Sequence, residues 1–297
     1  MPNPNRLPLL VCLTLLVAGC AASVGPSSSP VGSASPPPSV APTITGIDHP
    51  TGATDVVLRV EEGGGFIRPD FLLTQGPIFT LYGDGTVIFR DNRAAPPQSN
   101  DGIGHALPYR TARLTEQQLQ ALLDQAINGG TLGIARANYN PGTIADAPTT
   151  TFTLKAGGLN KTVSAVALGI DVKPGPDTLT LTALAKLADR LRQFDQGGTF
   201  ATDVYKPSRY RGSLWDSGFV PGTPPKAWPW PNIKPADFTA PADPNALTFP
   251  RRTLTADEAA QLAIADFEGG LQQVFLKGPD GKAYSFALRP LLPDEPA

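Results

Sequence analysis

The chain has little cysteine and little histidine, two of each among its 297 residues. Both cysteines, Cys12 and Cys20, fall near the start of the chain, so the rest of it cannot form an internal disulfide. His49 stands beside Pro50 and His105 lies in a glycine-rich stretch, neither with a recognisable partner on a rigid element. We therefore expect no Ser-His-Asp triad, no site with paired histidine ligands and no cofactor.

Other catalytic signatures are also missing. The sequence contains no Gly-x-Ser-x-Gly nucleophile elbow and no Gly-Lys-Ser/Thr phosphate loop. Lysine and arginine are scattered along the chain and the formal net charge is −2, so no nucleic acid partner is predicted.

Paired carboxylates can face a cleft from distant parts of a chain, so a carboxylate-based hydrolase stays open as an alternative function. Asp146 is the acid to inspect first, because it lies in a long connection and ligand sites concentrate in such loops. The competing interpretation is an aspartate that fixes a turn before Pro148.

The sequence also lacks an apolar run long enough to cross a membrane as a helix. Its most apolar stretch, residues 7–18, covers about 12 residues and contains Pro8, whereas a membrane helix needs roughly 20. The stretch follows Arg6 and the amino terminus, an arrangement typical of an export signal peptide. Small residues then lead up to a cysteine, in the order Val17-Ala18-Gly19-Cys20.

This segment resembles the lipobox of bacterial lipoproteins. The resemblance implies a signal peptide at residues 1–19, cleavage between Gly19 and Cys20, and lipid attachment to the Cys20 sulfur. The membrane would then be a partner through this lipid, on the extracytoplasmic face of the bacterial cell envelope. Because Cys12 would leave with the signal, Cys20 would be the single thiol of the mature chain. That favours modification over an ordinary secretory signal with a chance cysteine.

Composition divides the remaining chain into four parts. Residues 20–47 carry the lipidation site and a Ser- and Pro-rich spacer, which cannot bury a core and reaches on the order of 30 Å as a coil. Residues 48–198 are interpreted as an α+β domain and residues 199–250 as a connecting arm rich in Pro and Trp. Residues 251–297 are interpreted as a helix-and-hairpin unit packed on the body.

Turn-forming residues between alternating apolar segments predict three β-hairpins and a further strand at 54–60. The hairpin arms are expected at 78–82 and 86–90, at 149–156 and 161–168, and at 271–277 and 282–289. With the helices described next, this order favours an α+β fold, in which antiparallel hairpins alternate with amphipathic helices packed on one sheet face.

Capping signals mark the helices. Thr115 with Gln118, and Thr255 with Glu258, have the capping-box spacing, and a glycine pair follows each segment at the same distance. A further helix is expected at 177–195. The repeated opening and ending favour the hypothesis of an internal duplication. The alternative is that two helices of similar length share common caps by chance.

The last part of the chain combines Leu254-Thr255-Ala256-Asp257-Glu258 with Gly269-Gly270 and a hairpin carrying Val274 and Tyr284. This order is similar to a PepSY-type module, a small extracytoplasmic unit of a helix and a hairpin. The resemblance implies an alternative function, the regulation or inhibition of an envelope protease.

Aromatic residues concentrate in one region, residues 205–249, which contains all three tryptophans of the chain. Flat rings beside polar groups suit a surface that binds a sugar, a peptide or a protein. The predicted ligand-binding residues are Tyr205, Tyr210, Trp215, Trp228 and Trp230. The alternative is a Pro-rich arm strapped over the body with its tryptophans buried. The favoured function is a non-catalytic binding ectodomain of a lipoprotein, for a wall glycan, a peptide or a protein partner.

Overall fold

The computed structural model describes residues 46–90, 101–140, 144–170, 174–195, 198–218, 222, 224–241 and 249–296. Gly19, Cys20 and nearly all of the predicted spacer lie outside the described residues. The described part has an α+β fold with two sheets, in which most neighbouring strands are antiparallel. Among the described residues, no helix combines the length and the apolar content needed to cross a bilayer.

The first sheet has eight strands in the order β6-β8-β7-β1-β2-β3-β5-β9. Its strands are β1 (Val56–Gly63), β2 (Phe79–Tyr82), β3 (Thr86–Arg90), β5 (Tyr109–Arg113), β6 (Asn138–Tyr139), β7 (Thr149–Ala156), β8 (Leu159–Val166) and β9 (Thr202–Val204). All neighbours are antiparallel except β6 and β8. The first two predicted hairpins, β2–β3 and β7–β8, are confirmed. Gly157 and Gly158 turn the second at φ 60° and 72°, which glycine adopts without strain.

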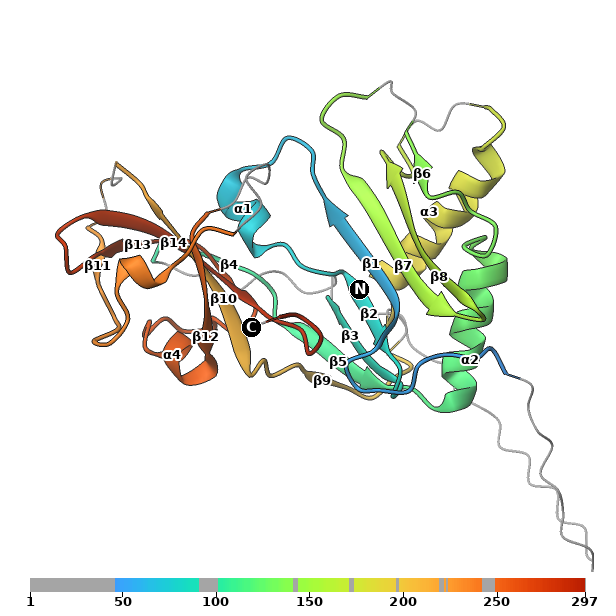
Figure 1. The fold of residues 1–297 in the computed structure, drawn as a ribbon, viewed down its shortest axis with the longest axis horizontal. Helices are drawn as coiled ribbons and strands as arrows, with labels where there is room; N and C mark the ends of the chain where they lie inside the picture. The colour runs from blue at the N-terminus through green and yellow to red at the C-terminus, as the bar shows by residue number, and fades with distance from the viewer. Residues whose placement is uncertain are drawn as a thin grey trace, which may run out of the picture. The chain divides into compact units, whose positions relative to one another are not determined.

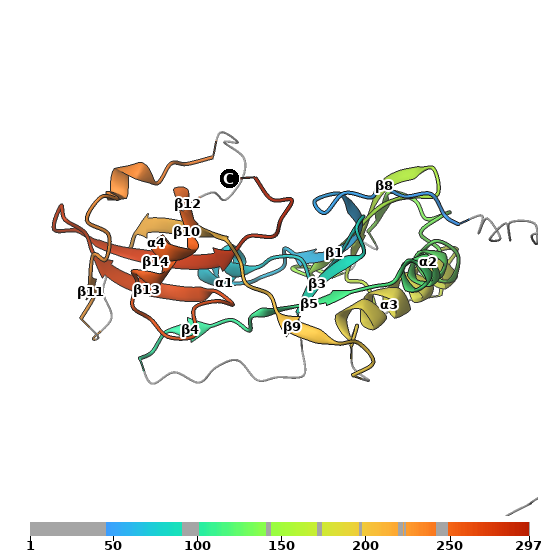
Figure 2. The same cartoon turned by 90° about the horizontal axis from the view of Figure 1, so that it is seen from below.

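Two helices, α2 (Glu116–Asp124) and α3 (Thr178–Arg192), lie next to each other against this sheet (Figures 1 and 2). The predicted capping box of α2 is present: the Thr115 hydroxyl accepts from the Gln118 N–H, and the Gln118 side chain accepts from the Thr115 N–H. A π-helical turn, η1 (Gln125–Gly129), follows α2. The two helices and the strands share one apolar core, with Leu119, Leu123, Leu184 and Leu191 packed with Val60, Phe79, Leu81, Phe89, Phe152 and Leu154.

The second sheet has the order β11-β13-β14-β10-β12, with β4 also paired to β13. Its strands are β4 (Gly104–His105), β10 (Arg209–Asp216), β11 (Lys226–Ala227), β12 (Arg251–Thr255), β13 (Leu271–Lys277) and β14 (Ala283–Pro290), and a short helix, α1 (Pro69–Thr74), contacts β13 and β14. β13 and β14 form the third predicted hairpin. Residues 209–216, assigned from composition to a connecting arm, instead supply the strand between β14 and β12.

One face of the second sheet is covered by part of the Pro-rich region and by the short helix α4 (Ala256–Ala260). Trp230, Ile233 and Phe238 come from the Pro-rich region and are buried there. Trp230 is 2% exposed, and its ring centroid lies 5.4 Å from that of Phe286 on β14. This part of the chain therefore supplies the second core with large rings rather than with the leucines of an amphipathic helix.

The helix predicted after Thr255 is shorter than expected. Thr255 and Glu258 form the predicted capping box, but α4 ends at Ala260, well before the glycine pair. After Ala260 the chain continues in turns, with left-handed backbone at Ala263 (φ 51°) and Asp266 (φ 50°), and these turns bury Leu262 and Ile264. The prediction of a second long helix is therefore wrong. The two capped segments differ beyond their first turns, and the internal duplication stays a prediction.

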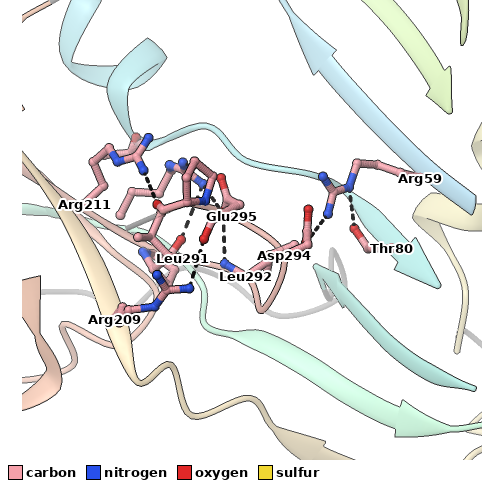
Figure 3. A network of polar contacts seen from close by, with 12 residues as sticks. Arg59, Thr80, Arg209, Arg211, Leu291, Leu292, Asp294 and Glu295 are labelled. Carbon is pink, nitrogen blue, oxygen red and sulfur yellow. Dashed lines mark hydrogen bonds and ion pairs between the residues drawn. The ribbon is translucent and has the colours of Figure 1, made fainter. Parts of the chain in front are cut away.

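Residues 291–296, which we call the joint segment, connect the two sheets through polar contacts (Figure 3). On the side of the first sheet, Asp294 Oδ1 accepts hydrogen bonds from Arg59 Nη2 and Tyr82 Oη, both at 2.6 Å. Arg59 Nε also donates to Thr80 Oγ1 at 3.1 Å. Burial opposes ionisation of Asp294, but the hydrogen bonds from Arg59 and Tyr82 outweigh it and lower the pKa of Asp294.

On the side of the second sheet, the joint segment is held by Glu295. Its carboxylate accepts from both Nη atoms of Arg289, at 2.7 and 3.0 Å, and from the Leu292 N–H at 2.8 Å. Arg209 Nη2 on β10 donates to the Glu295 carbonyl oxygen at 2.9 Å. From the first sheet, Tyr205, whose N–H bonds to the Tyr109 carbonyl oxygen, donates its Oη to the Leu291 carbonyl oxygen at 3.1 Å. The joint segment thus bonds to strands of both sheets, which shows how two separate cores are held in one folded body.

Candidate functional site

An open groove lies at one end of the second sheet, beside the turn between β13 and β14. Its volume is about 670 Å³, within the range of roughly 300–1,000 Å³ that is common for small-ligand sites. The end of β10, the β13–β14 turn and the 3₁₀ turn η2 (Pro235–Asp237) form its walls. We call it the aromatic groove and define it by Trp215, Asp216, Lys234, Asp280, Lys282 and Tyr284.

Aromatic side chains provide the apolar surface of the groove. Trp215 is half-buried, and its ring centroid lies 5.1 Å from that of Phe249. Tyr284 is also half-buried, with its ring centroid 6.1 Å from that of Trp228. Phe238 adds a buried ring beneath. Because Trp215 and Tyr284 keep part of their rings exposed, a ligand can cover apolar surface there.

Charged and polar groups surround these rings. Asp216 Oδ2 and Lys282 Nζ lie 3.8 Å apart, and more than half of each side chain is exposed. An exposed ion pair contributes only about 0–1 kcal/mol to stability, so these charges can exchange partners for a ligand at little cost. Tyr284 Oη donates to Asp280 Oδ2 at 2.6 Å. Burial first, and this hydrogen bond second, raise the pKa of Tyr284 to about 12, while the same bond lowers the pKa of Asp280.

The other two predicted tryptophans lie behind the groove and have a structural role. Trp228 Nε1 donates to the Ile233 carbonyl oxygen at 2.6 Å, and Trp230 Nε1 donates to the Glu258 carbonyl oxygen at 2.7 Å. Their ring centroids are 5.2 Å apart in an edge-to-face arrangement. Trp230 is buried and Trp228 half-buried, and both indole N–H groups have partners within the protein.

The predicted tyrosines do not line the groove. Tyr210 is 2% exposed and packs against Phe267 at 5.5 Å between ring centroids. Tyr205 is half-buried and bonds to the joint segment. Of the five predicted binding residues, the structure therefore places Trp215 in the groove and the rest in or near the packed interior.

Sequence reasoning missed the groove residues Asp216, Lys282 and Tyr284. A signal existed for two of them, because Lys282 and Tyr284 follow the predicted hairpin turn Pro279-Asp280-Gly281 and turns carry binding residues more often than strands do. The pairing of β10 with β14, which puts Asp216 opposite Tyr284, had no local signal.

Asp146 has the geometry of a turn residue. It is exposed, its φ is 57°, and its carbonyl oxygen accepts from the Phe66 N–H at 3.3 Å. Within the described ranges, no hydrogen bond or ion pair joins its carboxylate to another side chain, and no cluster of three metal-ligating side chains occurs. Among the described residues around Asp146, no second carboxylate pairs with it.

Comparison with protein-family models, with curated proteins and with solved structures gives no significant match. The geometry of the groove is therefore the observation that bears on function.

Proposed function

We propose that this chain is a lipoprotein of the bacterial cell envelope whose folded part binds a glycan in the aromatic groove without catalysing a reaction. The observation that carries the proposal is the combination of two half-exposed rings, Trp215 and Tyr284, with charges of both signs, Asp216 and Lys282. The C–H face of a sugar ring covers an aromatic ring, and sugar hydroxyl groups need both donors and acceptors. The groove offers both kinds of contact in a space that fits a few sugar units.

The membrane attachment in this proposal comes from the lipobox-like segment that ends at Cys20. Several acyl chains together hold a protein persistently, since each buried methylene contributes about 0.8 kcal/mol. Cys20→Ser should abolish incorporation of radiolabelled palmitate and release the chain from the membrane fraction of a bacterial host. Cys12→Ser, the matched control, should leave both unchanged. Labelling that persists in Cys20→Ser would overturn the anchor.

The glycan part is tested by titrating the full chain, held in detergent, with N-acetylglucosamine oligosaccharides and with soluble cell-wall fragments. Calorimetry should show saturable binding by the unmodified chain. Trp215→Ala and Tyr284→Ala should each weaken it by about tenfold or more, as expected for the loss of an aromatic contact of about 1.5 kcal/mol.

The matched control is Phe66→Ala, because Phe66 is an aromatic side chain 89% exposed outside the groove. It should bind like the unmodified chain, and circular dichroism should show that all three variants are folded. Unchanged binding by the folded Trp215→Ala and Tyr284→Ala variants would show that the glycan does not bind in the groove. If peptides bind and no oligosaccharide does, the ligand of the groove is a peptide rather than a glycan.

A further inference from the structure

Four arginines share one face of the second sheet, on the side opposite the aromatic core. Arg211 on β10 lies directly across from Arg289 on β14. Arg251 on β12 lies across from Ser213, and Ser213 shares a face with Arg211 and Arg209 because alternate residues of a strand point the same way. We call Arg209, Arg211, Arg251 and Arg289 the arginine row.

Within the part of the chain that the structure describes, a carboxylate balances only one of these charges. Glu295 accepts from both Nη atoms of Arg289. Arg209 and Arg211 donate instead to backbone carbonyl oxygens of the joint segment, each at 2.9 Å, as Figure 3 shows. Arg251 is exposed, and no described acidic side chain forms an ion pair with it. Among the described residues, Arg209, Arg211 and Arg251 therefore form no ion pair with a carboxylate, although the charge of Glu295 also acts on Arg211.

This arrangement works against stability. Arg211 faces Arg289, whose charge Glu295 balances, and it shares this face with Arg251 and Arg209. Like charges close together on neighbouring strands destabilise a sheet. Burial, and then the guanidinium groups of Arg289, Arg251 and Arg209, lower the pKa of Arg211 against the opposing effect of the Glu295 carboxylate. Arginine nevertheless stays charged near neutral pH. A negatively charged ligand would relieve this repulsion.

We infer that Arg211 and Arg251 bind a dianionic phosphate group of a ligand. A guanidinium group presents paired N–H donors that match the oxygens of a carboxylate or a phosphate, and Arg289 already holds Glu295 through such a pair. A phosphate monoester carries about −1.5 to −2 charges near pH 7, which balances two guanidinium groups, whereas one carboxylate balances one. Arg211 is half-buried and Arg251 exposed, so both can be reached from solvent.

This inference goes beyond glycan binding and uses different residues. The same phosphate chemistry is found in free phosphate, in phosphorylated sugars and in the headgroup of phosphatidic acid. The ligand class is therefore the monoester group, and the source is decided by experiment.

The test measures phosphate binding by the full chain in detergent, with inorganic phosphate as the probe in calorimetry. We expect saturable binding by the unmodified chain, and a loss of about tenfold or more for Arg211→Gln and for Arg251→Gln, since one charge-assisted contact is removed in each. Arg113→Gln is the matched control, because Arg113 is an exposed arginine paired with Asp84 on the first sheet. It should keep the affinity of the unmodified chain.

A second arm uses vesicles of phosphatidylcholine with and without phosphatidic acid. If the unmodified chain binds vesicles more tightly than Arg211→Gln does only when phosphatidic acid is present, and does not bind inorganic phosphate, the phosphate group is that of a lipid headgroup.

Trp215→Ala should retain phosphate binding, which separates this inference from the aromatic groove. If the unmodified chain binds neither probe, or if folded Arg211→Gln and Arg251→Gln bind like the unmodified chain, the inference is overturned.

Discussion

The two sheets are covered by different kinds of element, so their buried cores are built differently. The first is covered by α2 and α3, which are amphipathic helices with leucines at helical spacing. The second is covered by a Pro-rich region that contributes Trp230 and Phe238, and by the single short turn of helix α4. The strands of each sheet come mostly from one stretch of chain, 56–204 for the first and 209–290 for the second, and β4 is the exception that joins the second sheet from the first stretch.

This difference shows that a core can be built without periodic leucines when a few large rings have their polar atoms satisfied. Trp230 buries a whole indole because its N–H reaches the Glu258 carbonyl oxygen. Each core buries four aromatic residues, but the first mixes them with more aliphatic side chains. A single ring is therefore a larger share of the second core, and its loss there should have a larger effect.

The largest effect is expected for Trp230→Ala. Removing a fully buried indole leaves a cavity and takes one of two hydrogen bonds from the Glu258 carbonyl oxygen, and should lower the free energy of unfolding by about 3–5 kcal/mol. Leu187→Ala in the first core, from a side chain 2% exposed, should cost toward the lower end of about 2–5 kcal/mol. Urea unfolding followed by tryptophan fluorescence and by circular dichroism measures both. A smaller loss for Trp230→Ala than for Leu187→Ala would reverse the comparison.

The next effect concerns the joint segment, on which both sheets depend. Asp294→Asn removes the charge that Arg59 and Tyr82 hold, and should cost about 2 kcal/mol, the value of hydrogen bonds to a charged group. Asp203→Asn on β9 is the control, because Asp203 is exposed, and it should change the free energy of unfolding by less than about 0.5 kcal/mol. Chemical denaturation near neutral pH checks both.

The same aspartate gives a pH dependence of known sign. Its pKa is lower in the folded state than in the unfolded chain. The stability it contributes is therefore complete above the unfolded pKa of about 3.9 and is lost as the pH falls through the folded pKa. The difference in stability between the unmodified chain and Asp294→Asn should shrink as the pH is lowered below about 4. A difference that stays constant would mean that the charge of Asp294 does not matter.

A smaller effect is expected at the two capping boxes. Thr115→Ala should cost about 1 kcal/mol, since the hydroxyl that accepts from Gln118 is lost at the start of a full helix. Thr255→Ala should cost about 0.5 kcal/mol, because α4 makes only one turn behind its cap. Serine at either position should restore most of the stability. Equal losses would indicate that α4 matters to the second sheet as much as α2 does to the first.

The smallest expected effect is a change in the pKa of Tyr284 in the aromatic groove. The pKa of Tyr284 is raised to about 12 by burial and by Asp280. Asp280→Asn should lower this pKa only in part, since burial remains, and should leave the pKa of Tyr205 near 12. Difference absorbance of the tyrosinate, compared with Tyr284→Phe, assigns the transition. No shift in Asp280→Asn would mean that the Tyr284–Asp280 bond is absent in solution.

Local patterns predicted the first sheet better than the second. Gly157-Gly158 turned a hairpin as expected, and the spacing of Thr115 and Gln118 began a helix as expected, because both depend on neighbouring residues alone. The same capping signal after Thr255 was followed by one helical turn and then by further turns, in which Leu262 and Ile264 are buried in the second core. A strong cap starts a helix but does not fix its length.

The candidate site was predicted in part. Composition pointed to the region of the tryptophans, and Trp215 does border the groove. The rings of Trp228 and Trp230 have the same local sequence character, yet their indole N–H groups bond inside the protein. Contacts with residues distant in sequence place Trp215 at the groove and pack Trp228 and Trp230 against the second core.

The sequence by itself determined the hairpin turns and the helix starts, because each rests on residue types a few positions apart, and it contains the lipobox-like segment on which the proposed anchor depends. Only the tertiary structure decided that residues 209–216 lie inside a sheet, and that Arg211, Arg251 and Arg289 share one face. Strand pairing joins segments through backbone hydrogen bonds, which depend little on side-chain identity. The sequence therefore gives little indication of which strands pair. The groove and the arginine row both arise from such pairing.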